Sequence, residues 1–115
     1  MDSKELTKKI CTLIDEKKGI DIKVIDISKI SVIADYFVIA GGSNSRQIQS
    51  IADNIEESLL AEKVHPKSLE GYQGANWILM DYGDVIIHIF NQEVRLFYDL
   101  ERIWTDGQLI DPADL

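Results

Sequence analysis

The hydrophobic positions near the N-terminus follow a helical period. Apolar side chains recur there every three to four residues: Leu6, Ile10, Leu13 and Ile14. Asp2 and Glu5 have the spacing of a capping box just ahead of them, and Gly19 stands where such a helix would end. This pattern predicts a first helix that buries one face.

Two extended segments and a second helix follow. Residues 20–28 are rich in β-branched side chains and partly alternate, which predicts a strand. Residues 36–40 form a continuous apolar run, typical of a strand buried on both faces, and residues 29–35 are a short connection of unassigned form. Residues 41–45 end the second strand and offer several N-cap side chains. The apolar positions after them are predicted to share one helical face: Ile48, Ile51, Ala52, Ile55, Leu59 and Leu60.

The segment 63–74 contains Pro66, Gly71 and Gly74 and is predicted to be a loop. Two apolar, strand-like runs come next and flank a turn at Gly83-Asp84. If these two residues form the turn of a hairpin, three pairs of residues share one face: Trp77 with Phe90, Leu79 with His88, and Asp81 with Ile86.

The two faces of this hairpin differ in chemistry. One is almost wholly apolar and is predicted to lie beneath the helices: Ile78, Met80, Tyr82, Val85, Ile87 and Ile89. The other combines large aromatic rings with His88 and Asp81. Such a face is either open to a partner or part of the core, and the pattern alone leaves both readings for Trp77 and Phe90.

A last short helix is predicted from Asn91 or Gln92 through Tyr98. The elements in chain order are then α-β-β-α-β-β-α, which predicts an α/β fold with a mixed β-sheet and flanking helices. A chain of 115 residues forms one domain of this kind, so we expect a single domain over residues 1–115.

The net charge of −8 is concentrated in the last third of the chain. Residues 81–115 hold eight of the 20 acidic side chains and only two of the 12 basic ones. Binding to a phosphate backbone relies on Lys and Arg, so direct DNA binding is not expected, whereas a basic protein partner is favoured. No apolar run approaches the ~20 residues of a membrane helix, so no membrane association is expected. The lone Cys11 and the lack of a targeting pattern at the N-terminus indicate a cytoplasmic location.

Candidate catalytic patterns are weak. Gly41-Gly42-Ser43 stands between a strand and a helix, as in nucleotidyltransferases, but those enzymes need paired carboxylates on a following strand to hold Mg²⁺. The next acidic residues fall on the predicted helix, and Asp81 and Asp84 flank a turn. The two histidines, His65 and His88, are too far apart in the sequence to match the ligand spacing of a zinc site. We therefore expect no enzyme activity, no metal and no cofactor, and Gly41–Ser43 is interpreted as a tight turn.

Nearly the whole chain resembles the ribosomal silencing factor family, also called the Iojap-like family. The resemblance rests on these segments: ADYFVIA at 34–40, SNSRQ at 43–47, IAD at 51–53, EG at 70–71, WILMDYGDV at 77–85, HIF at 88–90, EVR at 93–95, YDLER at 98–102 and Trp104. It implies a nucleotidyltransferase-like α/β fold without the catalytic carboxylates. It also implies a translation repressor that binds the large ribosomal subunit through its protein fourteen, blocks joining of the small subunit under nutrient limitation, and often forms homodimers.

A contact surface for a basic partner follows from the aromatic and charged residues of the last third. Aromatic side chains anchor interfaces, and carboxylates pair with Lys and Arg. The predicted partner-binding residues are Trp77, Asp81, Tyr82, His88, Phe90, Arg95, Tyr98 and Glu101. Two other readings remain, an enzyme of nucleotidyl transfer and an adaptor for a different basic protein.

Overall fold

The computed structural model describes residues 1–93 and 107–115. Its elements, in chain order, are α1 (Ser3–Glu16), β1 (Ile20–Asp26), β2 (Tyr36–Gly42), α2 (Ser45–Leu60), β3 (Ser68–Glu70), β4 (Trp77–Asp81), β5 (Val85–Asn91), β6 (Gln108–Ile110) and the short 3₁₀ helix η2 (Pro112–Asp114). The predicted α/β fold with a mixed sheet is confirmed. Most of the last helix predicted from the sequence, from residue 94 to Tyr98, lies outside the described residues.

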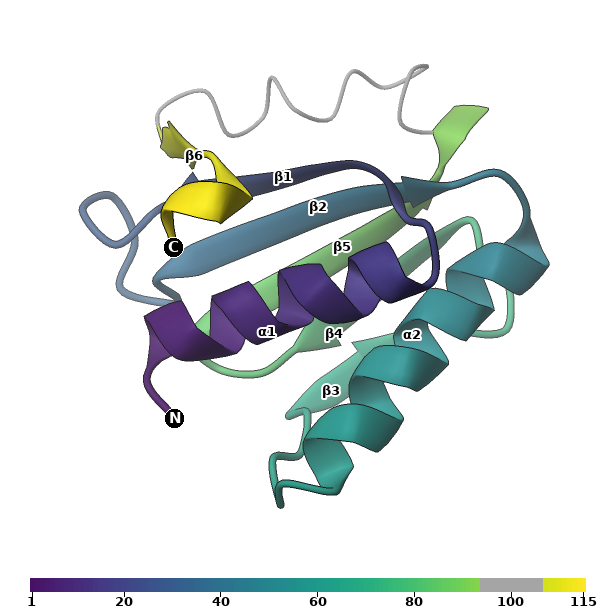
Figure 1. Cartoon of the computed structure of the whole chain (residues 1–115), viewed down its shortest axis with the longest axis horizontal. Coiled ribbons are helices and arrows are strands. Elements are labelled where there is room, and N and C mark those ends of the chain that lie inside the picture. Colours follow the sequence, from purple (N-terminus) through teal and green to yellow (C-terminus); the bar gives the residue numbers. More distant parts are fainter. Residues whose placement is uncertain (94–106) are drawn as a thin grey trace.

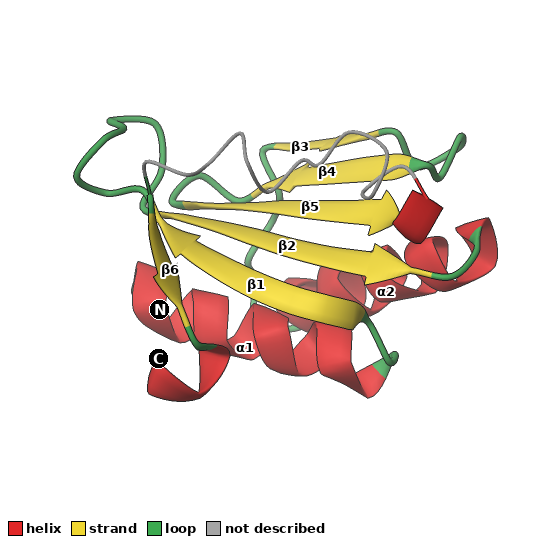
Figure 2. Ribbon diagram, turned by 90° about the horizontal axis from the view of Figure 1, so that it is seen from above, coloured by secondary structure: helices red, strands yellow, loops and turns green. Residues whose placement is uncertain are grey.

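The strands form one six-stranded sheet in the order β3-β4-β5-β2-β1-β6. β2 and β5 pair in parallel at its centre, and every other neighbouring pair is antiparallel. Both helices pack on one face of the sheet, which leaves the opposite face free of α1 and α2 (Figure 1; Figure 2). We call this opposite face the helix-free face, a name that refers only to α1 and α2. In the part of the chain that the structure describes, no helix is long and apolar enough to span a membrane.

The helix starts agree with the predicted caps. Asp2 Oδ1 accepts a hydrogen bond from the Glu5 amide at 2.8 Å, and Asn44 Oδ1 accepts one from the Gln47 amide at 2.9 Å. Each bond satisfies an N–H group that has no partner within its own helix. The apolar stripe of α1 is buried as predicted, together with Cys11, whose burial raises its thiol pKa to about 12.

Three local predictions are wrong. β1 ends at Asp26 rather than at residue 28, because the Asp26 carboxylate accepts hydrogen bonds from the amide and hydroxyl of Ser28 and turns the chain. Leu60 is 51% exposed, since it lies one position around the helix from the buried Leu59. The segment expected to be a loop contains β3, which pairs with β4 and is too short to show a period.

Candidate functional site

The β4–β5 hairpin has the predicted register. Trp77 is opposite Phe90, Leu79 is opposite His88, and the Tyr82 amide donates to the Val85 carbonyl at 2.9 Å. Gly83 takes a positive φ of 88° in the two-residue turn, a conformation that glycine adopts without strain. A register shift of one residue would exchange the two faces, so this pairing determines which side chains can meet a partner.

The apolar face of the hairpin lies beneath the helices, as predicted. Its central residues are fully buried: Ile78, Met80, Val85, Ile87 and Ile89. Tyr82 belongs to this face and is only 9% exposed, and burial raises its pKa to about 12. The structure therefore places Tyr82 on the opposite side of the sheet from Trp77, and the two predicted contact residues are not brought together.

Four rings gather on the helix-free face and form what we call the aromatic cluster: Phe37, Trp77, His88 and Phe90. The ring centres of Trp77 and Phe90 are 4.9 Å apart, and His88 stacks on Phe90 at 5.9 Å with a 5° angle between the rings. Phe37 meets His88 edge-on at 5.2 Å. Phe90 and His88 are 1% and 4% exposed, whereas Trp77 is 44% exposed. Trp77 is thus the most exposed ring of the cluster, and the buried rings of His88 and Phe90 pack against it.

A hydrogen bond fixes the orientation of the exposed indole. Trp77 Nε1 donates to His88 Nδ1 at 3.2 Å, which requires that Nδ1 carry no proton. Burial lowers the pKa of His88 to about 4, so the imidazole is neutral at physiological pH and its proton resides on Nε2. The hydrogen bond to this neutral imidazole therefore restrains the position of the Trp77 indole.

Acid should destabilise the protein through His88. The pKa of this residue is about 4 in the folded protein, against an ordinary value of 6.5. As the pH falls below 6.5 the unfolded chain takes up a proton that the folded protein does not, so the free energy of unfolding falls. Between pH 8 and pH 5 we expect His88 to remove about 2 kcal/mol of stability.

Urea unfolding of the wild type, His88→Phe and His88→Gln at these two pH values measures this contribution. Both variants should lose about 2 kcal/mol less stability than the wild type over the interval. His88→Gln is the conservative variant, because an amide oxygen can still accept from the indole N–H. An equal pH dependence in all three proteins would contradict a neutral, buried His88.

The remaining predicted contact residues divide into two groups. Asp81 is partly exposed, and its Oδ1 accepts from the Gly83 amide at 2.7 Å, so the carboxylate also stabilises the hairpin turn. Three lie outside the described residues: Arg95, Tyr98 and Glu101. Phe37 was missed by the sequence interpretation. Its place in the cluster depends on the parallel pairing of β2 with β5, which no local pattern reveals.

The turn between β2 and α2, at Ser43 and Asn44, is closed by nearby side chains. Gln47 Oε1 accepts from the Ser43 amide at 2.7 Å, and Asn44 caps α2. These bonds use amides that a phosphate-binding loop would direct at its ligand. Over residues 1–93 and 107–115, no group of three or more His, Cys, Asp or Glu side chains is placed to hold a metal ion. The prediction that Gly41 and Gly42 form a tight turn is wrong, because both belong to β2 and pair with Phe90 and Asn91 of β5. The turn into α2 begins only at Ser43.

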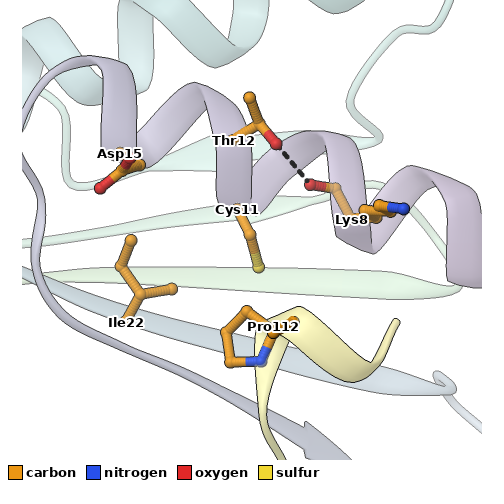
Figure 3. Close-up of a pocket in the computed structure, with 7 residues that line it drawn as sticks. Lys8, Cys11, Thr12, Asp15, Ile22 and Pro112 are labelled. Atoms are coloured by element: carbon orange, nitrogen blue, oxygen red, sulfur yellow. Dashed lines mark hydrogen bonds between the residues drawn. The ribbon is translucent and has the colours of Figure 1, made fainter.

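A pocket of about 330 Å³ lies between α1, β1 and η2 (Figure 3). Cys11, Ile22 and Pro112 form its apolar part, and the Thr12 hydroxyl donates to the Lys8 carbonyl at 3.2 Å. A thiol with a pKa of about 12 is a poor nucleophile at neutral pH. The pocket is on the helix side of the sheet and is separate from the aromatic cluster.

The fold and the site together define a small protein with a mixed six-stranded sheet and a half-exposed indole that is hydrogen-bonded to a buried histidine. The comparisons with known proteins define it further. The chain belongs to the ribosomal silencing factor family, because the family model described as "Ribosomal silencing factor during starvation" matches residues 1–115. The resemblance noted in the sequence is thereby confirmed.

Relatives and solved structures agree with this assignment. The chain is 37% identical over 111 residues to ribosomal silencing factor RsfS of Bacillus subtilis, which covers 96% of this chain and 94% of that protein. A crystal structure of a protein from Chromobacterium violaceum superposes with a TM-score of 0.87 at 31% identity and covers 90% of this chain and 87% of that one. A more distant mouse relative, 28% identical over 111 residues, covers 90% of this chain and 49% of its own length; it is named mitochondrial assembly of ribosomal large subunit protein 1.

Proposed function

We propose that this protein is a translation repressor that binds the large ribosomal subunit through its protein fourteen. Bound there, it sterically blocks joining of the small subunit when nutrients are limited. Family membership supports this proposal, and so does the name of the mouse relative, which refers to the large subunit. No chemical step is needed, because a bound protein that occupies the joining surface is sufficient.

The observation that carries the proposal is the exposure of Trp77 beside the buried rings of His88 and Phe90. Tryptophan is the residue most enriched among binding hot spots, and it contributes most when its position is fixed in advance. Phe90 and His88 supply that support, so we assign contact to Trp77 and a supporting role to the two buried rings. Tyr82 is also buried and stays outside the proposed contact.

Charge complements this anchor. Residues 81–115 carry eight acidic and two basic side chains, and ribosomal proteins are basic. Opposite charges steer the partners together and disfavour bare RNA. Asp81 lies four residues after Trp77 on the same face of the hairpin and is the described carboxylate best placed to contribute. We also propose that three residues outside the described ranges contact the partner: Arg95, Tyr98 and Glu101. A cytoplasmic location and a homodimeric state are further parts of the proposal.

The test is a subunit-joining experiment on sucrose gradients. Purified small and large subunits are mixed at moderate Mg²⁺ concentration, with and without a several-fold excess of the protein. We expect the protein to sediment with free large subunits and the peak of joined ribosomes to shrink. Trp77→Ala at the same concentration is the matched control and should restore joining. An unchanged peak of joined ribosomes with saturating wild-type protein would refute the proposal.

A further inference from the structure

A second apolar surface lies at the other end of the sheet, on the loop that joins β1 to β2. We call residues 27–35 the β1–β2 loop. Three of its side chains are turned to solvent: Ile30 is 55% exposed, Val32 is 105% exposed and Ile33 is 75% exposed. Single exposed apolar residues are ordinary, but three exposed β-branched side chains within four positions concentrate apolar surface on one loop, which we call the apolar patch, and exposed apolar patches mark interaction sites.

The loop has a defined conformation. The Ile27 amide donates to the Asp35 carbonyl at 2.9 Å and closes the base of the loop, and the amides of Ile30 and Ser31 both donate to the Ile27 carbonyl. Ser31 Oγ accepts from the Ile33 amide at 3.0 Å. These bonds fix the backbone with the three apolar side chains pointing outward, so the patch is present before a partner binds.

Buried residues attach the loop to the helix-free face. Ile27 and Ala34, at the two ends of the loop, are buried in one cluster with Ile39 and Phe90. The loop projects beyond the end of the sheet on the side away from the helices (Figure 2). The patch and Trp77 therefore belong to the same side of the molecule.

The spacing of the two surfaces suits one partner. The Asp35 amide donates to the Asp84 carbonyl at 2.8 Å, which places the loop beside the start of β5, whereas Trp77 is opposite Phe90 near its end. Phe90 is six positions after Asp84 along an extended strand, so the two residues are about 20 Å apart. A standard interface covers roughly 800 Å² on each partner, which is wide enough to include both ends.

The charges around the loop indicate the chemistry of this partner. Asp26 directly precedes the loop and Asp35 is its last residue. Desolvation is the main cause that raises the pKa of Tyr36, and the charges of Asp26, Asp35 and Asp2 raise it further, which places all three carboxylates near the base of the loop. Lys29 is the one basic side chain within the loop itself. An apolar projection with carboxylates at its base is complementary to an apolar depression rimmed by Lys or Arg. It is not complementary to an anionic lipid surface or to RNA.

We propose that the β1–β2 loop is a second anchor for the same basic protein surface of the large ribosomal subunit that Trp77 contacts. This inference rests on the proposed function and adds a contact region to it. Ile30, Val32 and Ile33 insert into an apolar depression of the partner. The partner then contacts both ends of the helix-free face at the same time, and the loop and Trp77 contribute to a single binding event.

The test is the affinity of labelled protein for purified large subunits, measured by co-sedimentation. The double variant Val32→Ser with Ile33→Ser removes the two most exposed side chains of the apolar patch and keeps every backbone bond of the loop. Its urea midpoint should equal that of the wild type, because both side chains are exposed. We expect its affinity to be at least about tenfold weaker. Leu60→Ser, which removes a 51% exposed apolar side chain from the end of α2, should bind like the wild type.

The outcomes separate this inference from the proposed function. Wild-type affinity in the double variant, together with lost binding in Trp77→Ala, would overturn the second anchor and leave the proposed function intact. A wild-type protein that does not sediment with large subunits would overturn both. A double variant that retains subunit affinity but loses self-association in sedimentation equilibrium would show that the patch binds a second copy of the chain, which also overturns the inference.

Discussion

Replacing Gly71 by alanine is expected to destabilise the protein by about 2 to 5 kcal/mol and to displace Trp77. Gly71 has a φ of 80°, a conformation in which a β-carbon is strained. That β-carbon would also lie 2.1 Å from the Trp77 carbonyl oxygen, which is far inside van der Waals contact. Either the loop or the first residue of β4 must move, and the aromatic cluster is built on that residue.

Gly74→Ala is the matched control for this change. Gly74 lies in the same loop, has no atom within 4 Å of an added β-carbon, and its φ is outside the positive range. Its substitution should alter stability by less than about 0.5 kcal/mol. Urea unfolding gives the stabilities, and co-sedimentation with large subunits gives the binding. Equal stability of the two variants would show that the backbone accommodates Gly71→Ala without displacing β4.

The parts of the fold that sequence patterns predicted well are local. The caps at Asp2 and Asn44 depend on residues three positions away, and the hairpin register depends on a turn of two residues. Local rules of hydrogen bonding and side-chain alternation are sufficient for such elements. The strand order and the strands β3 and β6 depend on pairings between distant segments, and the short strands leave no period in the sequence.

The candidate site shows the same limit. The sequence placed Trp77 and Phe90 on one face but left open whether they are surface or core. The structure separates them, because β5 is a central strand with neighbours on both sides. β3 ends opposite Leu79, so Trp77, at the first position of β4, extends beyond its edge neighbour. The exposure of Trp77 thus results from the length of a strand that the sequence pattern did not reveal.

The supporting role of His88 could be predicted only in part. Its pairing opposite Leu79 followed from the hairpin register, which also brings it diagonally next to Trp77. Its burial and its contact with Phe37 required the central parallel strand pair. The hydrogen bond to the Trp77 indole then follows from an imidazole that burial keeps neutral.

Trp77→Ala is expected to weaken binding to the large subunit by at least about 30-fold while leaving the fold intact. A preorganised tryptophan anchor typically contributes about 2 kcal/mol or more to binding, which corresponds to this factor. Because the side chain is 44% exposed and at the first position of its strand, we expect its removal to lower the free energy of unfolding by only about 1 kcal/mol. The measurements are co-sedimentation and urea unfolding of the same preparations.

Two variants show which property of Trp77 matters. Trp77→Phe keeps an aromatic ring but loses the N–H that bonds to His88, so it should retain part of the affinity. Asp114→Asn removes one exposed tail charge, which is expected to contribute less than about 1 kcal/mol. If Trp77→Ala unfolds at lower urea yet binds normally once folded, the indole is structural and the contact surface lies elsewhere. If it folds normally and loses binding while Asp114→Asn does not, the exposed indole on the helix-free face is the anchor.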